Sequence, residues 1–278
     1  KQSGIKEEFE NVTIRIPHRA VIGTDEFDKF MKDNHPWEKA LKITDNKKVE
    51  RAFKKARLSM DLMLKLENFI QDHKYPLAVR SSSLLEDSQY QPLAGTYETI
   101  MLPNNSRSSK KRLVKLITAI KYVFASTFKG EAKSLLDNTA HRIEEEKMAV
   151  IIQELVGQPY ESKRFYPTFS GVLKSINYYP VSYMKRDEGV VYLALGFGRT
   201  IVDGEKCLRI SPKYPSILPQ FFSMKATKQN SQNKFYGLPL KSIKNNSNED
   251  LFPFSLQDAE KDGALKWLGS VISNDDNT

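Results

Sequence analysis

The stretch LAVRSSSLLEDS, residues 77–88, places Arg80 between an apolar run and three consecutive serines, with Glu86 and Asp87 close behind. A guanidinium is always charged and presents a planar fork of N–H donors that matches the oxygens of a phosphate. The hydroxyls beside it are further donors, and irregular backbone can direct N–H groups at an anion. These residue types suit a phosphate site. They equally allow Arg80 to pair with Glu86 or Asp87 and only hold the loop in place.

Two glycine-containing segments also have residue types that can contact a ligand. Gly95 stands just before a predicted strand, where a glycine either lets the backbone approach a ligand or forms a turn, and the turn is the commoner case. LALGFGRTIVDGE, residues 193–205, has three glycines around Arg199. It departs from G-x-G-x-x-G because Ile201 stands where the third glycine belongs, and no Walker lysine follows. By itself this segment is a weak indication of phosphate binding.

MAVIIQELV, residues 148–156, is the most strand-like run of the chain, and Gln153 and Glu154 interrupt its apolar character. Such polar residues fit a strand edge that bonds a planar heterocycle. They fit almost as well a point where the strand leaves the core for the surface. The residues alone leave both interpretations open.

The composition is that of a globular chain large enough to bury a core, with 278 residues, 40% of them hydrophobic and 28% charged. No apolar run approaches the roughly 18 residues that cross a bilayer. The single Cys207 excludes internal disulfides, and four scattered histidines leave little for a Cys/His metal site. We therefore expect a cytoplasmic protein without a membrane partner.

The net charge of +9 comes mostly from residues 104–133, where eight basic side chains face a single acidic one, Glu131. The basic residues are Arg107, Lys110, Lys111, Arg112, Lys115, Lys121, Lys129 and Lys133. Apolar residues recur there at helical spacing, which predicts a helix with one buried stripe and lysines opposite. The lysines form either a solvated face or a docking face for an acidic partner or a nucleotide. No zinc finger or RNA motif accompanies them, so nucleic acid is not expected as a partner.

The remaining pattern predicts an α+β fold, because strands and helices are mixed without a regular βαβ rhythm. Residues 224–250 are polar and receive no predicted element. Strands are expected at residues 12–17, 77–80, 96–102, 148–156, 170–175, 190–195 and 206–210, and helices from Thr24, from Asn46, in the basic stretch and at 256–268.

Five ordered blocks, taken together, resemble one known family. VRSSSLLED…LAGTYETIM resembles the VRSSA…ED…AG…ET pattern in the nucleotide-binding domain of phosphoenolpyruvate synthases and pyruvate phosphate dikinases. MAVIIQELV, SGVLKSINYYP and LGFGRTIVDGE are similar to that family's MAV-V-VQ-MV, SGV-F-NP and GLGE-VVSGE segments. IPHRAVIGTDEFDKFM is similar to its VP-GFV-TT-AF-F segment, so the blocks reach from residue 16 to about residue 210.

The resemblance implies a partial ATP-grasp-like domain over residues 1–222, with two lobes that meet near residues 75–160 and hold ATP, and a polar, partly disordered tail or next segment over 223–278. Arg80 would be the catalytic phosphate contact, and Mg²⁺ would accompany the nucleotide. The implied nucleotide-binding residues are Arg80 and Ser81 at the phosphates, Gly95, Thr96 and Thr99 in a covering segment, Gln153, Glu154 and Val156 along the adenine, and Gly196, Gly198 and Arg199 at the phosphate end.

The implied activity is that of a phosphotransferase: ATP, pyruvate and water give AMP, phosphoenolpyruvate and phosphate through a phosphohistidine on a separate carrier domain. A pyruvate-binding domain of the parent protein would be the second partner. Three departures from the family pattern bear on this. Arg199 replaces the family's usual Glu, its amino-terminal Gly-Gly-Lys is absent, and its distal carboxylates are expected beyond Thr278.

The chain alone is therefore expected to be inactive. Two alternatives keep the same fold. In one, the acceptor is a glucan or an antibiotic; in the other, the chain is a non-catalytic, nucleotide-binding regulatory module.

Overall fold

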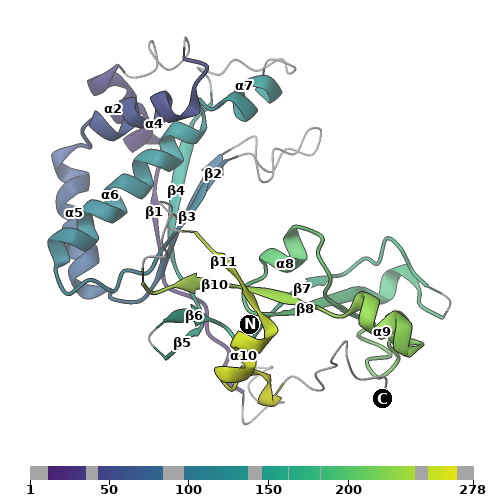
Figure 1. Ribbon diagram of the computed structural model, residues 1–278. Coiled ribbons are helices and arrows are strands. Elements are labelled where there is room, and N and C mark those ends of the chain that lie inside the picture. Colours follow the sequence, from purple (N-terminus) through teal and green to yellow (C-terminus); the bar gives the residue numbers. More distant parts are fainter. Residues whose placement is uncertain are drawn as a thin grey trace. The chain divides into compact units, whose positions relative to one another are not determined.

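The computed structural model describes residues 12–35, 43–83, 97–136, 146–161, 163–181, 183–241 and 250–267, and its helices and antiparallel sheets confirm the α+β class. The chain divides into two compact units, Lys1–Leu155 and Val156–Thr278, here called unit 1 and unit 2 (Figure 1). Every ladder between the named strands is antiparallel in this part of the chain. Each unit is built around its own sheets.

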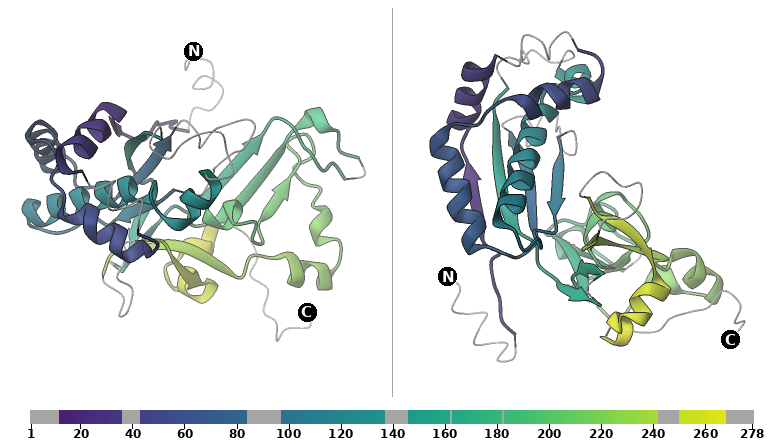
Figure 2. Two further views of the ribbon diagram at one scale, coloured as in Figure 1. Left: turned by 90° about the horizontal axis from the view of Figure 1, so that it is seen from above. Right: turned by 60° about the vertical axis from the view of Figure 1, so that its left-hand side comes forward.

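Unit 1 contains a four-stranded sheet in the order β1-β4-β2-β3, with helices packed against one of its faces (Figure 2). The strands are β1 (Arg19–Ile22), β2 (Leu77–Ser83), β3 (Thr99–Leu102) and β4 (Met148–Glu154). The helices are α2 (Thr24–Asn34), α4 (Asn46–Lys55), α5 (Met60–Asp72), α6 (Ser109–Ser126) and α7 (Gly130–Leu136).

The core of unit 1 lies between this sheet and its helices. Alternation along β2 and β4 turns every second side chain toward the helices, where Val79 pairs with Ile152 and both are fully enclosed. Phenylalanines from the helices meet them, with ring centroids 5.1 Å apart for Phe27 and Phe124 and 5.3 Å for Phe30 and Phe124. Each such side chain contributes about 1.5–3 kcal/mol by leaving water, so this layer fixes the sheet against the helices.

Two predicted elements of unit 1 were wrong. The strand expected at residues 12–17 is irregular, and the strand begins only at Arg19, where the chain comes into register with β4. The helix expected from Asn46 is two helices, because Ser59 caps a new helix by accepting the N–H of Leu62. The break changes the phase of the apolar stripe, and Met60, the first residue of the second helix, is 75% exposed.

The strand that contains Arg80 is longer than predicted. Ser81, Ser82 and Ser83 do not form a loop but continue β2 opposite Val150, Ala149 and Met148 of β4. The ladder with β4 pairs the serines along one side of β2, whereas the ladder with β3 ends at Arg80. The consecutive serines therefore belong to a strand, and their side chains alternate between its two faces.

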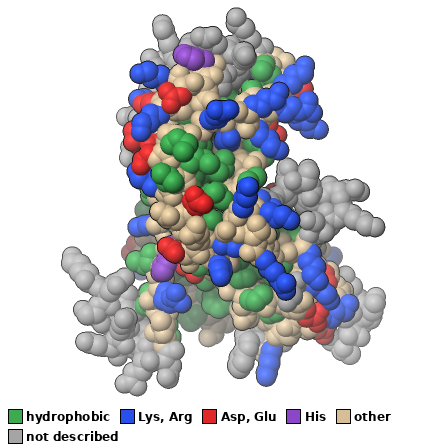
Figure 3. All heavy atoms as spheres, turned by 90° about the vertical axis from the view of Figure 1, so that its left-hand side faces the viewer, with side chains coloured by type: hydrophobic (Ala, Val, Ile, Leu, Met, Phe, Trp, Pro, Cys, Tyr) green, Lys and Arg blue, Asp and Glu red, His purple; other side chains and the backbone are tan. Residues whose placement is uncertain are grey.

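The basic stretch forms α6 followed by α7, and the predicted apolar stripe is buried, as at Leu116, Ile120 and Phe124. Not all of its cations are solvated, however. Arg112 is buried and donates to the main-chain oxygens of Ser106 and Ile70, at 2.9 and 2.7 Å. On the face of the molecule shown in Figure 3, Lys and Arg side chains surround a group of hydrophobic side chains.

Unit 2 contains a four-stranded sheet in the order β11-β10-β6-β5 and a three-stranded sheet in the order β7-β8-β9. The strands are β5 (Gln158–Tyr160), β6 (Arg164–Tyr166), β7 (Phe169–Lys174), β8 (Val190–Leu195), β9 (Leu208–Ile210), β10 (Lys234–Pro239) and β11 (Phe252–Ser255). The α-helices are α8 (Arg199–Val202), α9 (Met224–Asn230) and α10 (Leu256–Lys261), and short 3-10 helices lie at Arg186–Glu188, Pro219–Phe221 and Ala264–Trp267.

The segment 224–250, for which the sequence predicted no element, contains α9 and β10. β10 is an inner strand of its sheet, between β11 and β6, and buries Phe235 and Leu238. The polar composition of the segment hides this strand because most of its apolar residues lie in the short run of residues 235–240. The domain boundary predicted at residue 222 stays a prediction.

Candidate nucleotide-binding site

The face of the unit 1 sheet opposite the helices carries three of the predicted site residues. The antiparallel register aligns Val21, Ile151, Arg80 and Thr99 in one row across β1, β4, β2 and β3. Gln153 lies in the next row, opposite Ala78. Directly opposed side chains of an antiparallel pair are about 5 Å apart at Cβ. The fold thus places Arg80 and Thr99 opposite each other on neighbouring strands, with Gln153 on the same face.

The Arg80 side chain is exposed, and it has no ion-pair partner within the described residues. Its predicted alternative partners, Glu86 and Asp87, lie outside those residues, so that interpretation stays open. Arg19 of β1 is exposed on the same face, opposite Gln153, and the sequence reading missed it. Only the strand register reveals this second guanidinium, because β1 and β2 are distant in the chain.

Ser81 is not brought together with the Arg80 side chain. It is 7% exposed and faces the helices, opposite Val150, because neighbouring residues of a strand point to opposite faces. Ser82 is the serine that shares the face of Arg80 and pairs with Ala149. Gly95 and Thr96, predicted to cover the nucleotide, lie outside the described residues.

Glu154 ends β4 and is engaged with the segment before β1. Its carboxylate accepts the backbone N–H of His18 at 3.1 Å, and its own N–H donates to the His18 carbonyl at 2.8 Å. Burial, and after it the charge of Glu154, raises the pKa of Tyr75.

Val156, the first described residue of unit 2, is 60% exposed. Of the polar pair in MAVIIQELV, Gln153 therefore faces away from the helices and Glu154 holds the strand end.

In unit 2, the glycine-rich segment is fixed onto β10. Gly196 has φ +75°, and a Cβ there would lie 2.6 Å from the Tyr236 carbonyl oxygen, so the position requires glycine. The next residue, Phe197, donates its N–H to the same oxygen at 2.9 Å. Gly198 follows as the residue before α8. This close backbone contact, rather than free loop movement, accounts for the first glycine.

Arg199, the first residue of α8, has carboxylate partners. Its Nε lies 3.2 Å from Oδ2 of Asp203, its Nη1 lies 3.1 Å from Oδ2 of Asp250, and its guanidinium stands 5.1 Å from the centre of the Tyr236 ring. Partial burial acts to lower the pKa of Arg199, but the charge and hydrogen bonds of Asp250 and Asp203 outweigh it and leave the pKa above its usual value. An anion at this guanidinium would have to compete with both carboxylates.

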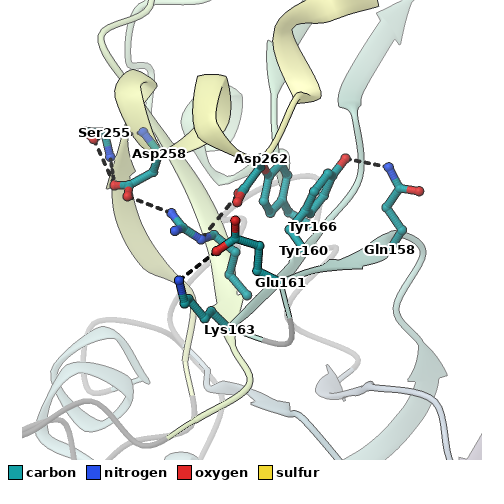
Figure 4. Close-up of polar contacts among 9 residues, drawn as sticks. Gln158, Tyr160, Glu161, Lys163, Tyr166, Ser255, Asp258 and Asp262 are labelled. Carbon is teal, nitrogen blue, oxygen red and sulfur yellow. Dashed lines mark hydrogen bonds and ion pairs between the residues drawn. The ribbon is translucent and has the colours of Figure 1, made fainter.

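A buried ion cluster around Arg164 is a feature of unit 2 that sequence reasoning missed (Figure 4). Arg164 of β6 has a side chain that is 9% exposed, and its nitrogens lie 2.9 Å from Asp258 and 3.3 Å from the fully buried Asp262. Tyr166 donates its hydroxyl to Asp262 at 2.7 Å. Burial, followed by this hydrogen bond, raises the pKa of Tyr166. The cluster joins β6 to the segment that follows β11. No local pattern predicts it, because Tyr166 and Asp262 are 96 residues apart in the chain.

Among the described residues, no group of three or more His, Cys, Asp or Glu side chains could hold a metal ion. None of the described helices is both long enough and apolar enough to span a membrane.

Comparison with known proteins places these features in a family. Residues 1–261 match the family described as pyruvate phosphate dikinase, AMP/ATP-binding domain, and the chain belongs to this family. The chain is also 28% identical over 192 residues to a Bacillus subtilis (strain 168) protein named Uncharacterized phosphotransferase YvkC. That match covers 68% of this chain and 20% of the relative, so the chain spans about a fifth of the relative's length.

Proposed function

We propose that the chain binds ATP on the face of unit 1 that carries Arg80, and that it donates phosphoryl groups within a phosphoenolpyruvate synthase-like enzyme. The observation that carries the proposal is the exposed Arg80 guanidinium, in register with Thr99, in a chain of an ATP-binding family. Among the described residues its N–H donors face no carboxylate that an incoming phosphate would have to displace.

In this proposal Arg80 contacts the phosphates and Thr99 adds a hydroxyl donor beside it. Each charge-assisted hydrogen bond contributes about 1.5–3 kcal/mol, so two or three such bonds suffice to select a phosphate. Gln153, on the same face, offers an amide donor and an acceptor to a planar base. Mg²⁺ is expected to arrive with ATP. The described residues form no metal-binding cluster, so we assign it no protein ligands.

The finer parts of the proposal follow from the resemblance. ATP, pyruvate and water would give AMP, phosphoenolpyruvate and phosphate, and a phosphohistidine on a separate domain would carry the phosphoryl group to a pyruvate-binding domain. The relative of which this chain spans 20% is long enough to contain such domains. The ATP-grasp-like fold, the cytoplasmic location and the roles of Gly95, Thr96, Glu154, Val156, Gly196 and Gly198 belong to the same proposal. Ser81 is left out of it, because its side chain faces the helices and not the face that carries Arg80. A glucan or an antibiotic remains the alternative acceptor.

One observation favours a second candidate, a nucleotide-binding module that has lost turnover. Arg199 stands where the family usually has Glu, and it is held by Asp203 and Asp250. The chain therefore lacks the carboxylate that the family's Glu would place near the phosphates of ATP. This candidate predicts that the parent protein binds ATP but releases no AMP from ATP and pyruvate, and detection of AMP would exclude it.

The first test is ATP binding by the 278-residue chain, measured by calorimetry up to millimolar ATP. Arg80→Ala should weaken binding at least tenfold, which corresponds to about 1.4 kcal/mol. Arg80→Lys should restore part of the affinity, because it keeps the charge but loses the fork. The control is Arg51→Ala, which removes an exposed arginine on α4. Equal affinities of Arg80→Ala and the unaltered chain would contradict the assignment of Arg80.

The second test uses the parent protein. Arg80→Ala should abolish ATP-dependent phosphorylation of the carrier histidine, while Arg51→Ala leaves it unchanged. The labelled histidine is detected with radioactive ATP under alkaline conditions, which preserve phosphohistidine. Unchanged labelling in Arg80→Ala would mean that the phosphates are held elsewhere.

A further inference from the structure

A buried lysine connects the helical layer of unit 1 to the strand that carries Thr99. Lys129 lies in the turn between α6 and α7, and its side chain is 11% exposed. Its ammonium contacts Oε1 of Glu50 on α4 at 2.5 Å and Oε1 of Glu98, the residue immediately before β3. One cation thus bridges two carboxylates from segments far apart in the sequence, and one of those carboxylates is adjacent to the proposed site.

The contacts with Glu50 and Glu98 stabilise the positive charge of Lys129. Burial by itself lowers the pKa of Lys129, and the hydrogen bonds to Glu50 and Glu98 outweigh burial and leave the pKa above its usual value. The turn itself is docked on α4, because the N–H of Gly130 donates to the Asn46 side chain at 3.0 Å. Lys129 is therefore a charged anchor on a rigid helical support.

β3 is a strand whose position depends on how its ends are held. It has four residues and, within the described part of the chain, lies at the edge of the sheet and pairs with β2 alone. Beyond its far end, the side chain of the buried Asn104 donates to the carbonyls of His73 and Tyr75, at 3.0 and 2.9 Å. At its near end, Glu98 is held by Lys129. Thr99 follows Glu98 directly and pairs with Arg80.

We propose that Lys129 is a positioning residue for the anion site: through Glu98 it sets the place of Thr99 relative to Arg80. The inference rests on the proposed function. Without the ammonium, the Glu50 and Glu98 carboxylates, whose side chains are 31% and 33% exposed, would lose the cation between them, and their repulsion would favour movement of Glu98 and the start of β3 away from Glu50. Glu50 has a different role, because it holds the lysine without touching β3.

The test separates positioning from general stability by comparing Glu98→Gln with Glu50→Gln. Each removes one carboxylate from Lys129, so the two should lower the free energy of unfolding by similar amounts. Only Glu98→Gln loosens β3, and we expect it to weaken ATP binding about fivefold while Glu50→Gln stays within twofold of the unaltered chain. Equal affinities in the two variants would overturn the inference.

Lys129→Met should weaken ATP binding at least as much as Glu98→Gln, and Lys129→Arg should recover part of the loss. The control is Lys121→Met, since Lys121 lies on α6, before the turn that contains Lys129, but donates to the main-chain oxygen of Lys54 and contacts no carboxylate among the described residues. Unaltered ATP affinity in Lys129→Met would also overturn the inference.

Hydrogen exchange in the ligand-free protein distinguishes failure of this inference from failure of the proposed function. The amides of β3 should exchange severalfold faster in Glu98→Gln than in Glu50→Gln, while those of β1 are unchanged in both. If this difference is found but the unaltered chain does not bind ATP, Lys129 positions β3 and the proposed function is wrong. If β3 exchanges alike in both variants, the positioning role is wrong whether or not ATP binds.

Discussion

Arg80 of unit 1 and Arg164 of unit 2 both lie on strands inside sheets, yet their surroundings are opposite. Arg80 is exposed, and no described carboxylate pairs with it. Arg164 is enclosed, and its guanidinium lies against Asp258 and the buried Asp262 and 4.9 Å from the centre of the Phe254 ring. A charge that has left water must be matched by partners, whereas an exposed charge keeps its donors available. The difference separates an arginine that holds the fold from one that can meet a ligand.

Arg199 lies between these extremes. Its side chain is 39% exposed, and its two carboxylate partners, Asp203 and Asp250, are 42% and 46% exposed. Solvent screens such pairs, so they contribute little to stability, but they do occupy the donors of the guanidinium. The three arginines thus form a series in how far carboxylates occupy their guanidinium donors: Arg80 least, Arg199 partly and Arg164 most. Each arginine can be tested by its own substitution.

The largest effect is expected from Arg164→Leu. It leaves Asp258 and Asp262 without their cation, and breaking a buried ion pair from one side costs about 3–5 kcal/mol. Urea unfolding followed by fluorescence should show this loss. Lys163→Leu is the control, because it removes a neighbouring pair with Glu161 that is more than half exposed on both sides. If Arg164→Leu lowers the free energy of unfolding by less than about 1 kcal/mol, the ion pairs of Arg164 are as weak as those of an exposed arginine.

Arg199→Ala should have an intermediate effect on stability, about 1 kcal/mol or less, because both of its ion pairs are solvent-screened. Its effect on ATP affinity should be less than threefold, and so smaller than that of Arg80→Ala. Calorimetry on the two variants side by side gives the comparison. An affinity loss equal to that of Arg80→Ala would show that Arg199 exchanges its carboxylates for phosphate.

The Arg164 cluster also predicts a pH dependence. Partial burial acts to raise the pKa of Asp258, but hydrogen bonds from Arg164 and Ser255 outweigh it and leave the pKa below its usual value. A carboxyl with a lowered folded-state pKa adds stability above its unfolded pKa of about 3.9 and loses it as the pH falls through the folded pKa. Urea unfolding between pH 6 and about pH 3 should therefore show a steeper decline in the unaltered chain than in Asp258→Asn. Parallel declines would mean that Asp258 titrates as an exposed carboxyl.

The smallest stability effect is expected from Arg80→Ala, because the side chain is exposed and leaves no described carboxylate unpaired. The free energy of unfolding should stay within about 0.5 kcal/mol of that of the unaltered chain. The same urea experiment measures it. A loss of several kcal/mol would indicate that Arg80 holds the fold, in the manner of Arg164, and would favour the loop-holding interpretation.

Much of the local structure followed from residue patterns. The run Val190–Leu195 is β8 as predicted, and the helix beginning at Asn46 starts there because Asp45 accepts the N–H of Lys47. The motif order also indicated the family to which the chain belongs. These features depend on residues close in the sequence, so composition and spacing are enough to predict them.

The site itself could be predicted only in part. Arg80 and Thr99 were recognised from their motifs, but the face on which each side chain lies depends on strand register, and this separates Arg80 from Ser81. Residue patterns led to the α+β class and the family because hydrophobic spacing, caps and motif order are local. Only the tertiary structure determined the strand register and two sets of ion pairs. Lys129 contacts Glu98, and Arg164 contacts Asp258 and Asp262. These contacts could not be predicted from the sequence, because packing brings each cation next to carboxylates that are distant in the chain.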